Sequence, residues 1–394
     1  MLIMENQIKF TEEQLKYAIE SKINEESGAN QLFEMVVNSL MYSEREAFLK
    51  EHKGETKGNG YRTLYKPGIN NKLKLAIPRD RMGVFQPLLL GIMNQQDETI
   101  KDLTFSLYGK GLTTRQISDV LEDIYGKSYS SSTVSNITKE FSDQMDAWLN
   151  RSLDSYYPVV YIDATYFKVR RDRVASEAFY VVMGVKDDYT REILTIVNMP
   201  TESASGWKEV LDNLKERGLE NVQLFVSDDL TGLKKSIDLS FPEARRQLCT
   251  LHFQKSLSRK VRVSERSEFI KDLKEIINPT INDNGREVSI KMLTNFLNEW
   301  QVKYPSFKRY NNQEYMEQIF EFKRYKKTIQ QMIYTTNWIE RLNKSFKRTL
   351  KIRNSMPSPE SALRLMCAVS IEMEQKVYKY PIYNFKFEEM LNRK

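Results

Sequence analysis

The sequence predicts an α/β protein with a mixed-sheet core, a helical insertion within that core, and a mainly α-helical region before it. Three observations support this fold class. Short apolar runs alternate with amphipathic segments between residues 158 and 251, as expected for a sheet with covering helices. Apolar residues recur at helical spacing on both sides of this stretch. The 394 residues are 40% hydrophobic, which is sufficient for several packed cores.

The composition excludes several classes of protein. With two cysteines and two histidines, neither a disulfide framework nor a four-ligand zinc site of these residues is expected. Charges come too early for a signal peptide, and no run approaches the roughly 18 apolar residues of a membrane span. The net charge of +7, from 60 basic and 53 acidic residues, is compatible with a polyanionic partner. We therefore expect a cytoplasmic protein with no membrane association.

The first 100 residues are expected to form a helical region, 1–55, and a short β/loop connector, 56–100. Leucine, isoleucine, methionine and valine recur at helical spacing over 10–50. The Gly- and Lys-rich stretch 51–70 predicts a break or an exposed hairpin. Leu73, Leu75 and Ile77 then alternate with other residues, which predicts a short strand that ends at Pro78.

Residues 101–153 are expected to hold a helix-turn-helix DNA-binding domain. Thr113 and Gln116 have capping-box spacing, and an apolar stripe follows at Ile117, Val120, Leu121 and Ile124 up to a closing Gly126. A second helix, capped by Ser130 or Ser131, has a buried face of Val134, Ile137 and Phe141. Small polar residues at its start are typical of a helix that reads a DNA groove. An ordinary helical hairpin is the alternative.

The exposed face of the second helix indicates which residues of this hairpin are expected to contact DNA. Those nearest the groove are Ser132, Thr133, Asn136 and Lys139. Arg115, on the first helix, is expected to contact phosphate, which positions the protein without specifying a sequence.

Residues 154–261 are expected to form the first part of the core. Three β-rich runs separated by short charged turns suit an antiparallel meander. A helix containing Trp207, Val210, Leu211 and Leu214, a strand, a second helix and a last strand, RQLCTL, follow. The order β-β-β-α-β-α-β is that of a ribonuclease H-like core. Residues 262–330 predict a helical insertion, and 331–394 the C-terminal core helices.

Two aspartates lie at strand positions suited to chemistry. Alternation along the first run places Asp163 with Tyr161 and Thr165 on one face, opposite Val160 and Ile162. A carboxylate inside a central strand is costly unless it is hydrogen-bonded, paired or bound to a cation. The second aspartate, Asp228, ends the next apolar strand, where α/β units carry functional groups.

Alternatives remain for these aspartates. Asp163 could bond a neighbouring loop at a strand end. Asp229 follows Asp228 directly, so either of the two could face a site while the other caps the next helix. We expect Asp228 to be the ligand and Asp229 to assist the turn.

Glu340 lies in the first turn of a strong helix over 336–352. Lysines share its face, which predicts a metal ligand beside a basic stripe that meets phosphate: Lys344, Lys347 and Lys351. A surface Glu–Lys pair is the alternative. Carboxylates on adjacent strands and a facing helix suit Mg²⁺ or Mn²⁺. Two such ions activate a hydroxyl and stabilise a leaving oxygen in phosphodiester chemistry.

Four phrases of the sequence resemble the Mutator-like bacterial insertion-sequence transposases, a DDE transposase family. They are YIDATYFKVR, VSDDLTGL, CTLH and YTTNWIERLNKSFKR, with further similarity upstream in IPRDRMGVFQP and in LYGKGLTTRQISDVLEDIYGKSYSSSTVSNIT. The resemblance extends from about residue 60 to the end and retains the order of the motifs.

The resemblance implies a site and an activity. It places the family's acidic triad on Asp163, Asp228 and Glu340, its basic residue on Lys347, and its Cys-x-x-His pair on Cys249 and His252. Asp229 stands where the family usually has glycine. His252 is expected either near the metals, touching DNA, or in a buried structural role.

The implied enzyme binds terminal inverted repeats, cleaves DNA at the element ends, and joins the 3′-hydroxyl to target DNA with two Mg²⁺ or Mn²⁺ ions. Expected partners are double-stranded DNA and further copies of the chain, in a homodimer or higher oligomer at the nucleoid. The alternatives are a helix-turn-helix regulator without nuclease activity, another ribonuclease H-like nuclease or integrase, and a transposase that binds without cutting.

Overall fold

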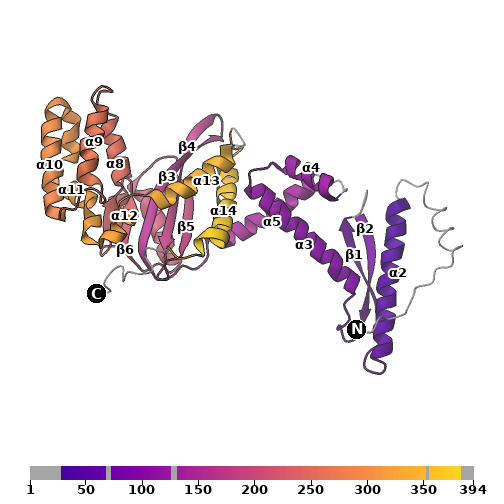
Figure 1. Ribbon diagram of the computed structural model, residues 1–394. Coiled ribbons are helices and arrows are strands. Elements are labelled where there is room, and N and C mark those ends of the chain that lie inside the picture. The colour runs from indigo at the N-terminus through magenta and orange to yellow at the C-terminus, as the bar shows by residue number, and fades with distance from the viewer. Residues whose placement is uncertain (1–27, 68–71, 126–130, 352–354, 383–394) are drawn as a thin grey trace. The chain divides into compact units, whose positions relative to one another are not determined.

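The computed structural model describes residues 28–67, 72–125, 131–351 and 355–382 (Figure 1). The chain divides into two compact units. The first comprises Met1–Tyr108 and Leu112–Lys139, and the second comprises Gly109–Gly111 and Glu140–Lys394.

The first unit contains a two-stranded antiparallel ribbon between helices. Its elements are α2 (Gly28–Glu51), β1 (Gly58–Pro67), β2 (Lys72–Asp80), α3 (Leu88–Gly109), α4 (Thr114–Tyr125) and the start of α5 (Ser131–Leu149). Leu73, Leu75 and Ile77 of β2 pack with Val37 and Met41 of α2, which confirms the alternation predicted from the sequence. The strand continues through Pro78, which pairs with Tyr61, because a ribbon of two strands tolerates proline at its edges. The part of the predicted N-terminal helix before residue 28 lies outside the described residues.

The start of helix α3 differs from the prediction, because it lies within the 56–100 stretch that the sequence predicts as a β/loop connector; the part of α3 from residue 101 onward lies in the region expected to be helical. Its first turn is capped from a distance by Glu44 of α2. The Glu44 carboxylate accepts hydrogen bonds from the backbone N–H of Leu88 at 2.7 Å and of Leu89 at 3.3 Å. A cap supplied by a residue so far away in the chain has no local sequence signature.

The capping box predicted for α4 is present. Thr113 N–H donates to Gln116 Oε1 at 2.9 Å, and Gln116 N–H donates to Thr113 Oγ1 at 3.3 Å. Ile117 and Leu121 are buried as predicted, but Ile124 is 59% exposed because it lies in the last turn of the helix. The buried face of α5 is confirmed, with Val134, Ile137 and Phe141. Gly126 and Ser130 lie outside the described residues.

The second unit is built on a five-stranded mixed sheet with strand order β5-β4-β3-β6-β7. The predicted order of elements is confirmed: β3 (Tyr156–Arg170), β4 (Val174–Val185), β5 (Arg191–Asn198), α6 (Ala204–Glu216), β6 (Asn221–Ser227), α7 (Leu233–Ser240) and β7 (Arg245–Leu248). β3, β4 and β5 pair antiparallel, whereas β6 pairs parallel with β3 and with β7. The predicted RQLCTL strand is shorter than expected, because Cys249 already caps α8 (Thr250–Ser258).

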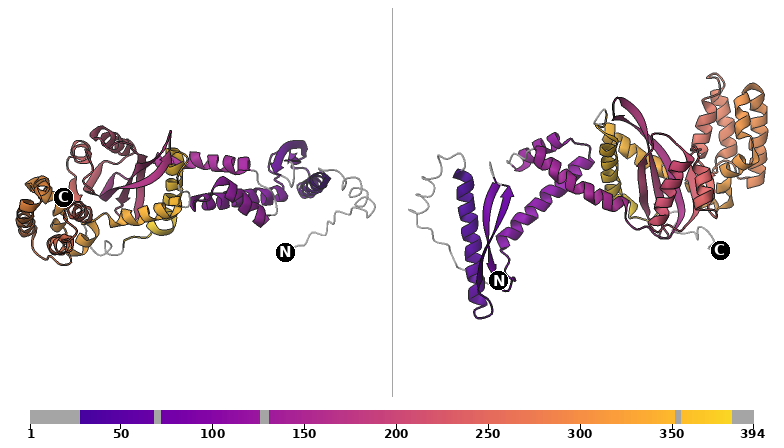
Figure 2. Two further views of the ribbon diagram at one scale, coloured as in Figure 1. Left: turned by 90° about the horizontal axis from the view of Figure 1, so that it is seen from above. Right: turned by 180° about the vertical axis from the view of Figure 1, so that it is seen from behind.

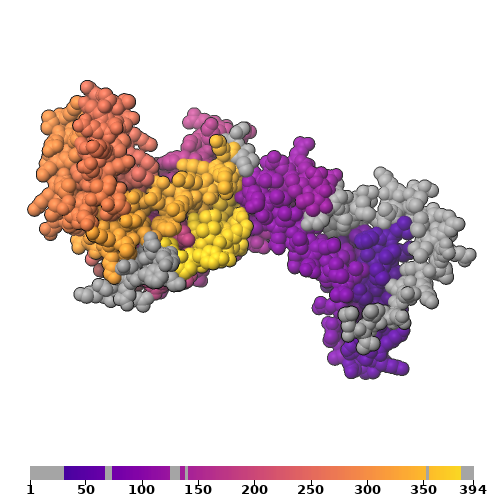
Figure 3. All heavy atoms as spheres, in the orientation of Figure 1, coloured from indigo at the N-terminus to yellow at the C-terminus, as the bar shows by residue number. Residues whose placement is uncertain are grey.

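The sheet is covered on both faces, as the sequence predicts. On one face, Val160 and Ile162 pack in a core with Trp207 of α6 and Leu233 of α7. On the other face lie α13 (Asn337–Lys351) and α14 (Pro359–Met373). A π-helical turn, Glu374–Tyr378, follows α14. Figure 3 shows the orange and yellow atoms of these helices over the sheet, and Figure 2 gives the view from behind.

The insertion between β7 and α13 is helical, as predicted. It contains α9 (Arg266–Ile277), α10 (Arg286–Lys303), α11 (Gln313–Ile319), α12 (Lys327–Ile333) and two 3₁₀ turns, Pro305–Tyr310 and Glu321–Arg324. Its own core includes Phe269, Leu273 and Phe296, whereas Met292 and Trp300 are only half-buried. Within the described residues, no helix combines the length and the apolar character needed to cross a membrane.

Candidate active site

Asp163 lies in the middle of β3 and points away from the α6–α7 core, as the alternation predicts. Its side chain is 4% exposed and faces α13. Asn343 of α13 donates a hydrogen bond from Nδ2 to Asp163 Oδ2 at 2.7 Å. The parallel pairing of β3 with β6 extends to Ile162 and Ser227, so Asp163 is the first residue of β3 beyond the end of β6. This position brings Asp163 close to Asp228, the residue after β6.

The electrostatic environment of Asp163 disfavours its charge. Burial is the main cause that raises its pKa to about 7; the charges of Asp228 and Glu340 also raise the pKa, and the charge of His252 lowers it. Three acidic groups therefore act on one another at this place. In the folded protein, a cation among them would relieve both the repulsion and the cost of burial.

Asp228 is held at the end of β6 by its backbone. Arg246 of β7 donates from Nη2 to the Asp228 carbonyl oxygen at 2.9 Å and from Nε to Ser227 Oγ at 3.3 Å. The backbone N–H of Cys249 donates to the Ser227 carbonyl oxygen at 2.8 Å. These bonds tie the turn that carries Asp228 to the next strand and to the start of α8.

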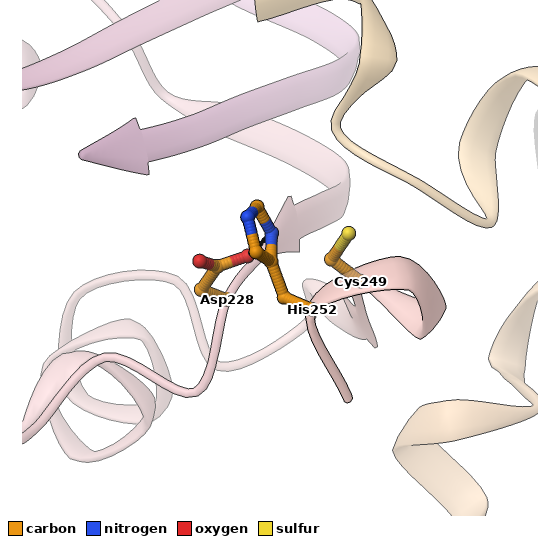
Figure 4. Close-up of side chains that lie close together, drawn as sticks. All are labelled: Asp228, Cys249 and His252. Carbon is orange, nitrogen blue, oxygen red and sulfur yellow. Dashed lines mark ion pairs between the residues drawn. The ribbon is translucent and has the colours of Figure 1, made fainter. Parts of the chain in front are cut away.

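The Asp228 carboxylate forms an ion pair with His252 of α8. Figure 4 shows the imidazole ring against the carboxylate, with Cys249 at the start of the same helix. Ligand atoms of Asp228, Cys249 and His252 lie within 4.8 Å of one another. Thr336 Oγ1 approaches the Cys249 sulfur at 3.5 Å, which links α8 to the segment before α13.

His252 is cationic in this environment. Although burial lowers its pKa, polar contacts with Asp228 and Cys249 raise the pKa to about 10. His252 Nε2 lies 3.9 Å from Glu340 Oε1, so the ring stands between two of the carboxylates. The positive charge of the ring partly offsets their mutual repulsion.

Glu340 occupies the first turn of α13, and its side chain is 23% exposed. Lys255 Nζ also lies 3.9 Å from Glu340 Oε1. Within the described part of the chain, Glu340 Oε1 is a buried atom with no hydrogen-bond donor, whereas Asp228 Oδ1 is paired with His252 Nδ1. Buried carboxylate oxygens without a donor are costly, and a hard divalent cation prefers such oxygen ligands. The donor set of Asp163, Asp228 and Glu340 therefore fits Mg²⁺ or Mn²⁺.

Asp229 is turned toward a different partner. Its Oδ2 lies 3.5 Å from Arg309 Nη2 in the insertion, and its side chain is exposed. Of the two adjacent aspartates, Asp228 is the one that the structure brings to Asp163 and His252.

The residues expected to bind DNA lie on exposed helix faces. Lys344, Lys347 and Lys351 project from the solvent side of α13, on the helix face that carries Glu340. Arg115 on α4 and Asn136 on α5 are also exposed, in the first unit. The side chains of the other three, Ser132, Thr133 and Lys139, lie outside the described residues.

Two residues of the site were not predicted as functional. Asn343 shares the helix face of Glu340, so its spacing of three residues from that glutamate was a usable signal. Arg246 had no such signal, because its role depends on the parallel pairing of β6 with β7.

Comparison with known proteins gives a consistent result over most of the chain. A family model described as "Transposase, Mutator family" matches residues 4–379. The chain is 30% identical over 392 residues to the transposase of insertion sequence element IS905 from Lactococcus lactis, covering 98% of this chain and 96% of that protein. It is 32% identical over 335 residues to the IS1201 transposase of Lactobacillus helveticus, covering 83% and 89%. The IS256 transposase of Staphylococcus aureus is 28% identical over 387 residues, covering 94% and 96%.

Proposed function

Since this chain belongs to the Mutator family of transposases, we propose that it cleaves DNA at the ends of an insertion sequence and joins the 3′-hydroxyl to target DNA. The observation that carries the proposal is the convergence of Asp163, Asp228 and Glu340 from two adjacent strand positions and a facing helix. The mixed sheet with three antiparallel strands and two parallel ones supports a ribonuclease H-like core.

Asp163, Asp228 and Glu340 would hold two Mg²⁺ or Mn²⁺ ions. When bound, such ions lower the barrier of phosphodiester chemistry by activating a hydroxyl and by stabilising the leaving oxygen. The protein's own residues prepare the site. Asn343 fixes the orientation of the Asp163 carboxylate, and Arg246 fixes the backbone at Asp228. Positioned ligands of this kind reduce the reorganisation that the reaction requires.

Recognition of the DNA ends is assigned to the first unit. The helix pair α4–α5, with its confirmed capping box and buried face, supports a helix-turn-helix reader of terminal inverted repeats. Transposition joins two ends, so a homodimer or higher oligomer on DNA is part of the proposal.

The proposal is tested by a cleavage assay on duplex DNA that carries the ends of the element. Cutting is expected in Mg²⁺ or Mn²⁺ and is expected to disappear in EDTA. Glu340→Gln is expected to bind the same DNA in EDTA with unchanged affinity and to lose cleavage, because the amide keeps the shape but not the charge of the ligand. Tight end-specific binding by the wild-type chain without any metal-dependent cutting would favour a DNA-binding regulator instead.

The lysines of α13 are expected to contribute phosphate contacts. Replacing Lys344, Lys347 and Lys351 together by alanine should lower duplex affinity and reduce the slope of log Kd against log salt by about one for each lost contact. The matched control is Lys271→Ala, Lys274→Ala and Lys291→Ala, three exposed lysines of α9 and α10. Equal losses in both variants would show that the α13 lysines act only through the overall charge of the protein.

A further inference from the structure

The excess of positive over negative charge in this chain is concentrated in one short stretch. Residues 57–81 contain seven basic residues and one acidic residue, Asp80, whereas the whole chain has a net charge of only +7. The remaining residues, 53 basic and 52 acidic, are almost balanced. In its described residues, 57–67 and 72–81, this stretch forms the β1–β2 ribbon of the first unit and the turn that follows it. The chain therefore carries nearly all of its excess charge on a single structural element.

The single acidic residue of the stretch offsets only one of its seven positive charges. Asp80 is buried, and its carboxylate accepts hydrogen bonds from Thr56 Oγ1 at 2.9 Å, from Met82 N–H at 3.1 Å and from Phe85 N–H at 3.0 Å. Of the basic side chains that the structure describes, Lys57, Arg62, Lys74, Arg79 and Arg81 are exposed, whereas Lys66 pairs with Asp97 of α3. In the described part of the chain, no carboxylate forms an ion pair with Arg62, Arg79 or Arg81.

The three arginines line one hollow. Arg62 lies opposite Ile77 in the ribbon, and Arg79 follows two residues later on the same face. Together with Arg81 they border a hollow of about 510 Å³ beside the start of α3. The other polar residues that line this hollow are Asn59, Asp80, Gln86 and Asn94. Guanidinium groups present several donors in a fixed plane and bind phosphate oxygens in pairs. Amide side chains beside them add further donors.

One edge of the ribbon is not free to pair with an added β-strand, and this favours DNA as the partner of the ribbon. The outer edge of β2 is occupied by α2: Asn38 donates from Nδ2 to the Lys74 carbonyl oxygen at 3.4 Å and accepts from Ala76 N–H at 2.8 Å. The backbone N–H groups at the N-terminus of α3 already donate to the Glu44 carboxylate, so they do not require a bound anion as a further acceptor. A two-stranded antiparallel ribbon has the width of the major groove of B-form DNA.

We propose that the β1–β2 ribbon is a second DNA-binding element of this protein, in which Arg62, Arg79 and Arg81 grip the phosphate backbone of duplex DNA. This inference rests on the proposed function for the choice of DNA as the ligand. It adds a contact surface separate from the α4–α5 helix pair and from the α13 lysines. The ribbon supplies affinity that is independent of sequence, whereas the helix pair supplies recognition.

The test uses the full chain in EDTA and a duplex of arbitrary sequence, so that neither metal nor element ends are required. A variant with Arg62→Ala, Arg79→Ala and Arg81→Ala is expected to bind at least about tenfold more weakly, with a salt slope lower by about two to three. The same three positions changed to lysine should restore most of the slope, because charge is kept while paired hydrogen bonding is lost. The α9–α10 lysine variant described above is the control of equal charge.

Each outcome is informative. An unchanged slope in the alanine variant, an equal loss in the control variant, or preferential binding of single-stranded DNA overturns the ribbon as a duplex-binding element. If the alanine variant does not fold, which a thermal melt detects, a comparison of the lysine variant with Arg62→Gln, Arg79→Gln and Arg81→Gln decides the question. Failure of the wild-type chain to bind any duplex would instead overturn the proposed function itself, whereas metal-dependent cutting with no loss in the ribbon variants would overturn only this inference.

Discussion

Asp163→Asn is expected to reduce DNA cleavage by at least about a thousandfold while leaving DNA binding in EDTA unchanged. The asparagine side chain keeps the size of the aspartate and can still accept the hydrogen bond from Asn343, but it removes the charge that would hold a divalent cation. Single-turnover cleavage of end DNA in Mg²⁺ measures the effect. Asp212→Asn, which changes an exposed aspartate on α6 that pairs with Lys208, is the matched control and should cut at the wild-type rate.

The same substitution is expected to stabilise the metal-free protein. Folding raises the pKa of Asp163 from 3.8 to about 7, mainly because the group is buried. A raised carboxyl pKa means that ionisation opposes folding, so the penalty is absent at low pH, grows from about pH 4 to pH 7, and is complete above that range. Asp163→Asn removes a penalty on the order of a few kcal/mol.

Thermal melts in EDTA check this expectation. At pH 8 the variant should melt several degrees above the wild-type protein, and at pH 4 the difference should be small. A variant that melts below the wild-type protein at pH 8 would show that the Asp163 carboxylate is stabilised by its neighbours, in which case the repulsion described above is not the dominant effect.

Gly232→Ala is expected to destabilise the second unit by about 2–5 kcal/mol and to lower cleavage with it. Gly232 has a φ of +80°, and a Cβ atom at this position would lie 2.5 Å from the backbone nitrogen of Ala204. The clash is with backbone, which cannot rotate away. The turn concerned begins at Asp228, whose carbonyl oxygen accepts from Leu230 N–H at 2.9 Å, so displacing the turn also displaces a proposed metal ligand.

Chemical denaturation of Gly232→Ala and of a control variant, Gly54→Ala, separates the cost of the left-handed backbone conformation from the cost of the clash with Ala204. Gly54→Ala is the control, because Gly54 has a φ of +98° but open space around its Cβ position. It should cost only about 1–2 kcal/mol, the ordinary penalty of a left-handed conformation. If the two substitutions cost the same, the contact with Ala204 has no energetic weight.

The order of elements in the second unit could be predicted because each element has its own pattern of apolar residues along a short piece of sequence. Alternation in β3 and helical spacing around Trp207 each fix which side chains are buried, and both predictions are confirmed. The start of α3 was not predictable, because its cap comes from Glu44 in another helix. Likewise, the exposure of Ile124 depends on where α4 ends, and a periodic pattern does not specify that point.

The proximity of the candidate site residues could be predicted from the sequence, but the contacts among them could not. The triad followed from strand positions and from the family resemblance, and the structure brings its members near one another. A place for His252 beside the site is one of the two expectations for this residue, since a histidine just after a strand faces either the site or the core, but its ion pair with Asp228 is not predicted by the sequence. The choice between Asp228 and Asp229 depended on the turn after β6 and on Arg309, which is distant in sequence.

The position of Glu340 beyond the insertion has a consequence during synthesis of the protein. The ribbon, the helix pair and both aspartates emerge from the ribosome first, and the long helical insertion is made before the glutamate appears. At about 5–20 residues per second, the interval between Asp228 and Glu340 is on the order of ten seconds. During that interval the nascent chain has its basic ribbon but an incomplete cutting centre. A message broken or frameshifted within the insertion would yield a product without Glu340, which on the proposed chemistry could occupy DNA without nicking the genome of its host.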